Sequence, residues 1–315
     1  MINHEHIFMR VLVTGGAGFI GSHLCDFLFK KSHSLVVIDD LSSGDLGNLN
    51  SIIKAIDFYQ AKLEEFDFTQ IGRVDAVIHL AAQVSVPVSI ESFRDSSSTN
   101  LLGSISVLDF CRKHDIPLVY ASSSAIYGNL ALGDDESKKI DLLSPYAVDK
   151  YAMEIYAKAA FKLYGLSSIG LRFFNVYGPR QDPTSPYSGV ISIFVDRLIN
   201  GKSIVINGGH QTRDFVYVDD VVNCLYRSLE VCLASSTCQQ INVLTGHSVS
   251  IDELVIMLSK DIMVDIDKTY QDLPEGDPEQ SNGTTDKMVR VLGIDLYGMV
   301  RIAVGLSKTI KFIRS

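Results

Sequence analysis

The sequence predicts an α/β fold in which a doubly wound parallel sheet is followed by a smaller, mixed α/β domain. Short apolar runs alternate with segments of helical periodicity up to about residue 175. The runs are apolar throughout rather than at every second residue, which is typical of parallel strands covered by helices on both faces. After residue 175 the alternation becomes irregular, which indicates the second domain.

The expected elements follow from these runs and from the turns between them. Before residue 175 the expected strands are Arg10–Thr14, Ser34–Asp39, Ile56–Gln60, Ala76–His79, Leu118–Ala121 and Ser167–Arg172. The expected helices in this part include Phe19–Phe29, Leu101–His114 and a long helix from Tyr146 to Tyr164. Later elements are a helix over Val190–Asn200, strands at Ile204–Ile206 and Phe215–Val218, and a functional loop over Asp272–Thr285. The first domain is then expected over residues 1–174 and 214–245, and the second over residues 175–213 and 246–315.

Composition narrows the class of protein. The 315 residues are 46% hydrophobic and 21% charged, as in a globular protein of about two domains whose core needs no disulfide or metal. The formal net charge is −9 and no block of Lys or Arg stands out, so we expect no nucleic-acid partner. No apolar run approaches the ~20 residues of a membrane span, and five scattered cysteines favour a reduced, cytoplasmic protein. Translation could begin at Met1 or at Met9, which directly precedes the first strand.

A glycine-rich turn follows the first expected strand. The turn and the start of the next helix read Thr14-Gly15-Gly16-Ala17-Gly18-Phe19-Ile20-Gly21. Gly15 and Gly18 let the backbone approach a pyrophosphate, and a helix that begins at Phe19-Ile20 directs free N–H groups at it. Asp39 ends the second strand near the ~20-residue spacing of an acid that binds ribose hydroxyls. The pattern predicts a Rossmann dinucleotide site, and Asp39 favours NAD because a carboxylate would repel a 2′-phosphate.

Two further segments lie where a dinucleotide would pass. The fourth strand ends in His79-Leu80-Ala81-Ala82, at the sheet edge where ligands of such folds bind. We expect Leu80, Ala81 and Ala82 to line the cofactor and His79 to be a structural hydrogen-bonding group. Asn100 begins a helix, where it either orders groups near the cofactor or caps the helix.

A tyrosine, a lysine and a serine form the candidate catalytic set. Tyr146 and Lys150 are four residues apart on one expected helix, which places them on the same face. The ordinary pKa of tyrosine is near ~10, and a neighbouring ammonium and a nicotinamide cation both favour the phenolate. Ser123, at the end of the fifth strand, would share the substrate proton. This set suits removal of a hydroxyl proton while hydride leaves the same carbon.

Together these motifs resemble the extended short-chain dehydrogenase/reductases, in their nucleotide-sugar epimerase/dehydratase branch. The resemblance covers nearly the whole chain. Its residues are Gly15-Gly16-Ala17-Gly18-Phe19-Ile20-Gly21, His79-Leu80-Ala81-Ala82, Ser122-Ser123-Ser124, Tyr146 with Lys150, Arg172-Phe173-Phe174-Asn175-Val176-Tyr177-Gly178-Pro179-Arg180, and Arg213-Asp214-Phe215-Val216-Tyr217-Val218-Asp219-Asp220. The resemblance implies a bound NAD, a UDP-sugar substrate and a tyrosine base.

The resemblance also implies which further residues contact each ligand. For NAD they are Ser42, Leu63, Tyr146, Lys150 and Phe174. For the substrate they are Val86, Ser123, Ser124, Asn175, Val190, Val205, Asn207, Arg213 and Ser281. Asn175 and Arg213 are expected on the diphosphate, which a guanidinium binds well through permanent charge and bidentate contacts. No metal ligand is expected.

The end of the fifth strand distinguishes between the reactions of this branch. Dehydratases of the family carry an Asp-Glu pair there and decarboxylases a Glu, whereas this chain has Ser124 and Ala125. The resemblance then favours 4-epimerization, by oxidation at one carbon and reduction from its other face. The alternatives are UDP-glucose/galactose 4-epimerization and another NAD-dependent nucleotide-sugar dehydratase or dehydrogenase. A non-catalytic NAD-sensing protein is disfavoured, because such relatives usually lose Tyr146 or Lys150.

Three further features refine the prediction. Acetylated-sugar epimerases of the family tend to have a small residue where this chain has Ser281, which favours UDP-GlcNAc and UDP-GalNAc. In the family an Asp commonly contacts adenine where this chain has Lys62, and a cation commonly contacts the diphosphate where it has Pro274. These two contacts are therefore either absent or made by other residues. The helix Tyr146–Tyr164 is apolar nearly all round, and with the resemblance this predicts a homodimer.

Overall fold

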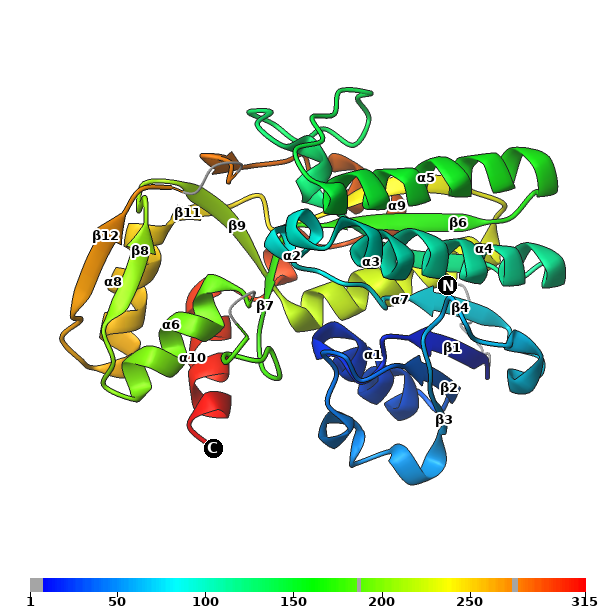
Figure 1. The fold of residues 1–315 in the computed structure, drawn as a ribbon, viewed down its shortest axis with the longest axis horizontal. Helices are drawn as coiled ribbons and strands as arrows, with labels where there is room; N and C mark the ends of the chain where they lie inside the picture. The colour runs from blue at the N-terminus through cyan, green and yellow to red at the C-terminus, as the bar shows by residue number, and fades with distance from the viewer. Residues whose placement is uncertain (1–7, 186–187, 274–276) are drawn as a thin grey trace.

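The central feature of the computed structural model is a seven-stranded sheet whose neighbouring strands are all parallel (Figure 1). The structure describes residues 8–185, 188–273 and 277–315, so the expectations for Met1 and Pro274 lie outside the described residues. The strand order is β10-β6-β5-β4-β1-β2-β3. The bounds are β1 Arg10–Thr14, β2 Ser34–Asp39, β3 Asp57–Gln60, β4 Ala76–His79, β5 Leu118–Ser123, β6 Ser168–Phe173 and β10 Cys238–Val243. The predicted doubly wound parallel sheet is confirmed, and its order reverses between β1 and β4.

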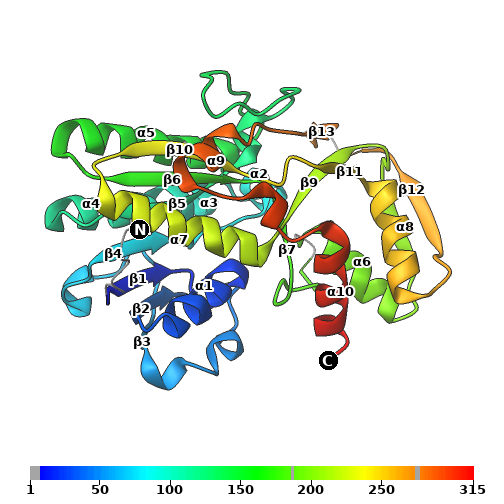
Figure 2. The same cartoon turned by 180° about the vertical axis from the view of Figure 1, so that it is seen from behind.

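Helices cover both faces of this sheet, because successive strand residues point to opposite faces. Val11 and Val13 of β1 pack in one core with Leu225 of a helix, while Leu12 packs in a second core with Met153. On the first face lie α1 Phe19–Lys30, α7 Val218–Ala234 and α9 Asp286–Leu292 (Figure 2). On the second face lie α4 Gly103–His114 and α5 Pro145–Tyr164, preceded by α2 Val86–Glu91, α3 Phe93–Ser97 and the π-type turn Ser98–Leu102. Single 3₁₀ turns are Leu46–Leu49, Ile53–Ala55, Phe68–Ile71, Ser124–Tyr127 and Leu296–Gly298.

The second part of the molecule extends beyond the carboxyl edge of the large sheet (Figure 1). A four-stranded sheet consists of β7 Asn175–Tyr177, β9 Thr212–Tyr217, β11 Ser248–Ser250 and β13 Gln280–Ser281. A separate pair consists of β8 Ile204–Asn207 and β12 Lys268–Gln271. The helices are α6 Val190–Ile199, α8 Ile251–Ile262 and α10 Ile302–Ile313, and their apolar faces share one core with β8 and β9. We find no helix in these described ranges with both the length and the apolar character to cross a membrane.

Most differences from the expected elements concern their ends. β5 continues to Ser123, because Ser122 and Ser123 pair with β6. The expected loop over 272–285 contains the two-residue strand β13, which pairs with β9. Within the expected first-domain segment 214–245, residues 214–217 belong to β9 and pair with the second sheet, whereas α7 and β10 join the large one. α9 also packs on the large sheet, although it follows residue 245.

Helix α5 has two apolar sides, as its sequence predicts. Met153 and Ala157 are buried against the large sheet. On the other side Ile155 is 50% exposed and Leu163 is 72% exposed, with Tyr156 and Tyr164 beside them. Leu102, just before α4, adds a further exposed apolar side chain. An exposed apolar surface of this kind marks a contact with another molecule.

We expect a second copy of the chain to cover this side of α5 in a two-fold symmetric dimer. Replacing Ile155 with Glu should then yield monomers at micromolar concentration, because a charge would be buried at the contact. Sedimentation velocity measures the mass. The matched control is Ile256→Glu on α8, since Ile256 is 53% exposed but lies on another element. A monomeric mass for the unchanged protein would contradict the prediction.

Candidate functional site

The glycine-rich turn between β1 and α1 has the backbone that close approach to a phosphate requires. Gly15 has φ +71°, and a Cβ there would lie 2.6 Å from the amide nitrogen of Ala81. A Cβ on Gly21 would lie 2.0 Å from the carbonyl oxygen of Gly15. Gly18 is the N-cap of α1 and supplies no side-chain cap, so the first N–H groups at Phe19-Ile20 stay available to an anion. These residues therefore fit a dinucleotide pyrophosphate.

Asp39 lies at the carboxyl end of β2, next to this turn. Its Oδ2 accepts a hydrogen bond from the amide of Ala17 and its Oδ1 one from the amide of Leu41, both at 2.9 Å. Desolvation raises the pKa of Asp39, and these hydrogen bonds oppose the shift. Of the neighbours implied by the resemblance, Ser42 is exposed and donates to Asp40 at 2.6 Å. Leu63 is instead buried in the core beneath α4.

His79 at the end of β4 has the structural role that the sequence predicts. Its Nδ1 is 2.7 Å from Oγ1 of Thr14, and its Nε2 is 2.9 Å from Oγ of Ser104. Burial lowers the pKa of His79 to about 3, so the ring is neutral. The Thr14 hydroxyl also accepts from the amides of Leu80 and Ala81 at 3.2 and 3.3 Å. The ring thus joins the glycine turn to the strand end on which a cofactor would lie.

Asn100 and Phe174 are buried beside the same edge of the sheet. The Asn100 side chain donates to the carbonyl of Gln83 at 2.9 Å and accepts from its amide at 2.8 Å. It therefore holds the loop that follows Ala82 and does not cap its own helix. Phe174 packs in an apolar cluster with Ile126 and Leu244.

The first turn of α5 positions the candidate base. Ser144 is the N-cap and accepts from the amide of Ala147 at 3.2 Å. The amide of Tyr146 donates to the hydroxyl of Ser89, the final-turn serine of α2, at 3.2 Å. Two of the free N–H groups at the start of α5 are thereby satisfied. The residue Tyr146 is only partly exposed.

The structure brings Tyr146, Lys150 and Ser123 together. Nζ of Lys150 donates to the carbonyl oxygen of Ala121 at 2.9 Å and lies 5.8 Å from the centre of the Tyr146 ring. The side chain of Ser123 lies close enough to the phenol of Tyr146 to favour the phenolate, and its hydroxyl accepts from the amide of Ala125 at 3.1 Å. Three polar groups therefore converge at the carboxyl end of β5.

Burial shifts the pKa of both titratable groups in this set. Desolvation raises the pKa of Tyr146, and the hydrogen bond from Ser123 only opposes this shift. The ammonium of Lys150 lies beside this ring and is bonded to the carbonyl of Ala121. Desolvation lowers the pKa of Lys150 itself to about 8, while the neighbouring carboxylate of Asp149 raises it. Asp149 is buried and accepts from the hydroxyl of Ser97 at 3.0 Å.

The second sheet gathers three of the expected substrate residues. Arg213 lies on the central strand β9, and Ser281 is its partner on β13. Asn175 begins β7, which also pairs with β9, and its Nδ2 is 3.5 Å from Oγ of Ser281. The guanidinium of Arg213 is buried and donates to Oδ1 of Asp277 at 2.7 Å. A diphosphate at this position would displace the carboxylate of Asp277 from Arg213 or share the guanidinium with it.

The other expected substrate residues come from separate elements. Ser124 follows β5 directly, Val86 and Val190 begin α2 and α6, and Val205 and Asn207 point to the exposed side of β8. Sequence reasoning missed the support that Ser89 and Asp149 give to the catalytic set, and the pairing of Asp277 with Arg213. Asp149 alone had a visible signal, because it directly precedes Lys150 in the sequence.

Comparisons with known proteins agree with this geometry. The UDP-glucose 4-epimerase of Mycolicibacterium smegmatis is 34% identical over 316 residues, which cover 98% of this chain and 99% of that protein. The solved UDP-glucose 4-epimerase of Thermotoga maritima with UDP-glucose has a TM-score of 0.90 and 34% identity, covering 97% and 99% of the two chains. The UDP-N-acetylglucosamine 4-epimerase of Methanobrevibacter ruminantium with UDP-N-acetylmuramic acid has a TM-score of 0.90 and 35% identity, covering 98% of each. The sequence model of one family matches residues 11–243, and the chain belongs to this NAD-dependent epimerase/dehydratase family, with NAD as its cofactor.

Proposed function

We propose that the protein is a 4-epimerase of UDP-hexoses and that UDP-GlcNAc and UDP-GalNAc are its favoured substrates. The observation that carries this proposal is the convergence of Tyr146, Lys150 and Ser123 at a strand end that lacks an acid–base pair. The positions after Ser123 are Ser124 and Ala125, neither of which can transfer the protons of an elimination. Proton removal and return at one hydroxyl is the chemistry that this set can perform.

In the proposed reaction, Tyr146 acts as a phenolate and takes the proton of the sugar O4, while Ser123 hydrogen-bonds the same oxygen. NAD, when bound, supplies the hydride acceptor and donor and a positive charge that favours the phenolate. Gly15, Gly18 and the N-terminus of α1 would hold its pyrophosphate, and Asp39 its ribose. After C4 is oxidised, the keto sugar turns its other face to the same residues. Tyr146 then returns the proton to O4.

The diphosphate is held while the sugar turns. Arg213 and Asn175 lie on adjacent strands and both carry N–H donors, which here bond to Asp277 and to the carbonyl oxygen of Asp214. Strong contacts at the diphosphate and weak ones at the sugar suit a reacting group that must move within the site. Arg213 keeps its charge at any pH, so its contact does not depend on a proton.

The acetylated substrate is proposed from the size of one side chain. Ser281 is small and lies beside Asn175, in a strand next to Arg213. Its hydroxyl leaves space for an acetamido group and can form a hydrogen bond with it. The similar enzyme of M. ruminantium is named as a UDP-N-acetylglucosamine 4-epimerase, which supports this choice. A cytoplasmic location is proposed with it, since all five cysteines are free thiols.

Replacement of Tyr146 with Phe tests the base. Loss of general acid–base catalysis should lower kcat by about 10² to 10⁴-fold, because the phenolate is the proposed acceptor of the O4 proton. Binding of UDP and of NAD, measured by calorimetry, should stay unchanged. Tyr151→Phe, on the next turn of α5, is the matched control and should keep kcat. Turnover of Tyr146→Phe within a few-fold of the parent would transfer the role to Ser123.

Asp149→Asn tests how the charge of Lys150 is maintained. The carboxylate favours the protonated amine, so its removal should lower the pKa of Lys150 below about 8. The ammonium would then be lost at lower pH, and the alkaline limb of kcat/KM should move down by about one pH unit. His79 also faces Lys150 but is neutral in this range. Asp109→Asn, which removes a surface carboxylate paired with Lys113, should leave the limb in place. An unmoved limb in Asp149→Asn would contradict the prediction.

Ser281→Tyr tests the acetylated substrate. A phenol should fill the space beside C2 of the sugar, so turnover of UDP-GlcNAc and UDP-GalNAc should fall by about 10²-fold or more. Turnover of UDP-glucose and UDP-galactose is the internal control and should persist. Coupled assays of each pair give both rates. Equal loss on both pairs, or no loss, would remove Ser281 from the sugar pocket.

A further inference from the structure

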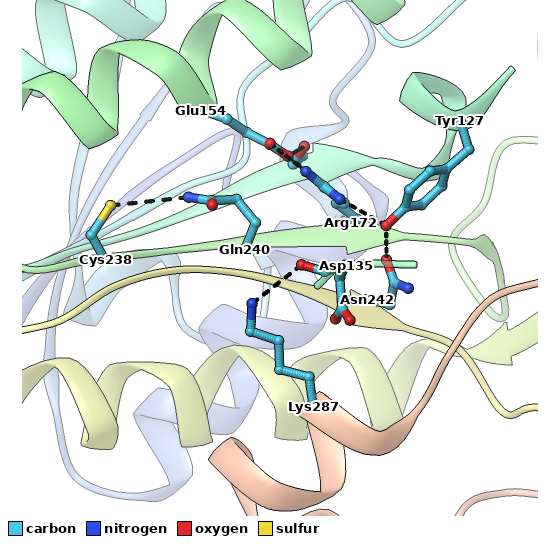
Figure 3. Close-up of polar contacts among 9 residues, drawn as sticks. Tyr127, Asp135, Glu154, Arg172, Cys238, Gln240, Asn242 and Lys287 are labelled. Carbon is cyan, nitrogen blue, oxygen red and sulfur yellow. Dashed lines mark hydrogen bonds and ion pairs between the residues drawn. The ribbon is translucent and has the colours of Figure 1, made fainter. Parts of the chain in front are cut away.

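A buried ion pair lies beneath the catalytic helix. Glu154 follows Lys150 by one turn on α5 and is fully buried, and Arg172 of β6 donates to its two carboxylate oxygens at 2.8 and 2.7 Å (Figure 3). Ser122, the residue before Ser123, donates its hydroxyl to the same carboxylate at 2.7 Å. A buried ion pair is by itself weak evidence for stability, because both charges lose their hydration. What this pair does is join α5 to β5 and β6 next to the catalytic set.

Tyr127 extends the pair toward β10. Arg172 Nη1 donates to the hydroxyl of Tyr127 at 2.7 Å, and that hydroxyl donates to Oδ1 of Asn242 at 2.7 Å (Figure 3). The direction of the second bond is fixed, since a guanidinium has no acceptor and a phenol has one proton. Burial raises the pKa of Tyr127 to about 12, so the hydroxyl keeps its proton at neutral pH.

Asn242 carries the connection across the site. Because its Oδ1 accepts from Tyr127, its Nδ2 faces the other way and donates to two carbonyl oxygens. These belong to Gly133, at 3.0 Å, and to Thr284, at 3.2 Å. The backbone amide of Asn242 is also bonded, to the carboxylate of Asp135 at 2.8 Å. The phenolic proton and the two carbonyl oxygens thus favour the same orientation of this amide side chain.

The segment reached in this way is the one that carries Ser281. Gly133 donates its amide to the carbonyl of Asn282 at 2.8 Å and accepts from the amide of Thr284 at 3.0 Å. Gly133 also lies flat against Tyr127, where a Cβ would be 2.5 Å from the ring. Hydrogen bonds therefore run without a break from the catalytic helix to the segment 281–284.

We propose that Tyr127 is a positioning residue for the reaction. Through Asn242 it holds the segment 281–284 at a fixed distance from the catalytic set, and it touches neither the sugar nor the cofactor itself. The proposal rests on the proposed function, in which this segment forms the sugar side of the site. A keto sugar that rotates within the pocket must present both faces of C4 to one base. The side of the pocket opposite that base must therefore keep its place.

Tyr127→Phe removes this hydroxyl and little else. We expect kcat for UDP-hexose epimerization to fall about tenfold or more, since small misplacements of a reacting group are costly. The Kd of UDP, measured by calorimetry, should stay within about twofold, because the diphosphate end is not part of the network. The matched control is Tyr177→Phe, whose buried hydroxyl donates to the carbonyl of Ile302 at 3.3 Å, outside the network. This control should keep both values.

Asn242→Asp provides a second variant, in case Tyr127→Phe folds poorly. The carboxylate still accepts from Tyr127 but has no donor for Gly133 or Thr284. Its loss of kcat should match that of Tyr127→Phe. The double variant should lose no more than the worse single one, because both changes interrupt the same path. Multiplied losses would show two independent effects and would overturn the proposal.

Amide hydrogen exchange tests the same idea without activity. In Tyr127→Phe the amides of Gly133 and Thr284 should exchange faster than in the parent, while those of β1 should not change. Unchanged exchange there, an unchanged kcat, or a joint fall of kcat and UDP affinity would each overturn the positioning role. A parent enzyme that interconverts no UDP-hexose would instead overturn the proposed function, and the exchange rates would still decide the role of Tyr127.

Discussion

The bond from the ammonium of Lys150 to the carbonyl oxygen of Ala121 is the contact on which the site depends. It fixes the position of helix α5 along strand β5. The bond lies one helical turn from Tyr146 and two residues from Ser123. A buried amine is stable there only because that carbonyl and the nearby carboxylate of Asp149 replace water. The ion pair of Glu154 with Arg172, one turn further along, supports the same alignment. A slip of α5 would separate the phenol of Tyr146, the amine of Lys150 and the hydroxyl of Ser123 at once.

Much of the large sheet could be predicted because its signals are local. β1, β2 and β4 begin and end at the residues that the sequence predicts, since each is a buried apolar run closed by glycine or a polar residue. The glycine turn could be predicted for the same reason, because every residue that it needs lies within one short segment. Tyr146 and Lys150 share one helix, so their spacing alone places them together.

What could not be predicted depends on residues that are distant in the sequence. The boundary between β9 and α7 falls between Tyr217 and Val218 without a polar or glycine break, so the run looks continuous. The pairing of β13 with β9, and of Asp277 with Arg213, joins segments more than sixty residues apart. The side chain of Asn242 joins Tyr127 to the carbonyl oxygens of Gly133 and Thr284, which are distant in the sequence. Such contacts have no periodic pattern in the sequence.

The return of α9 to the large sheet has a consequence for how the chain folds during synthesis. Met288 and Leu292 are fully buried in the same core as β1 and α1, although they stand near the end of the chain. The ribosome releases the chain from its N-terminus at about 5–20 residues per second, and domains commonly fold in that order. Here the core of the first strands stays incomplete until residues 286–292 of α9 have emerged. The two parts of the molecule therefore complete their folding together, and the apolar surface that α9 will cover remains open to chaperones until then.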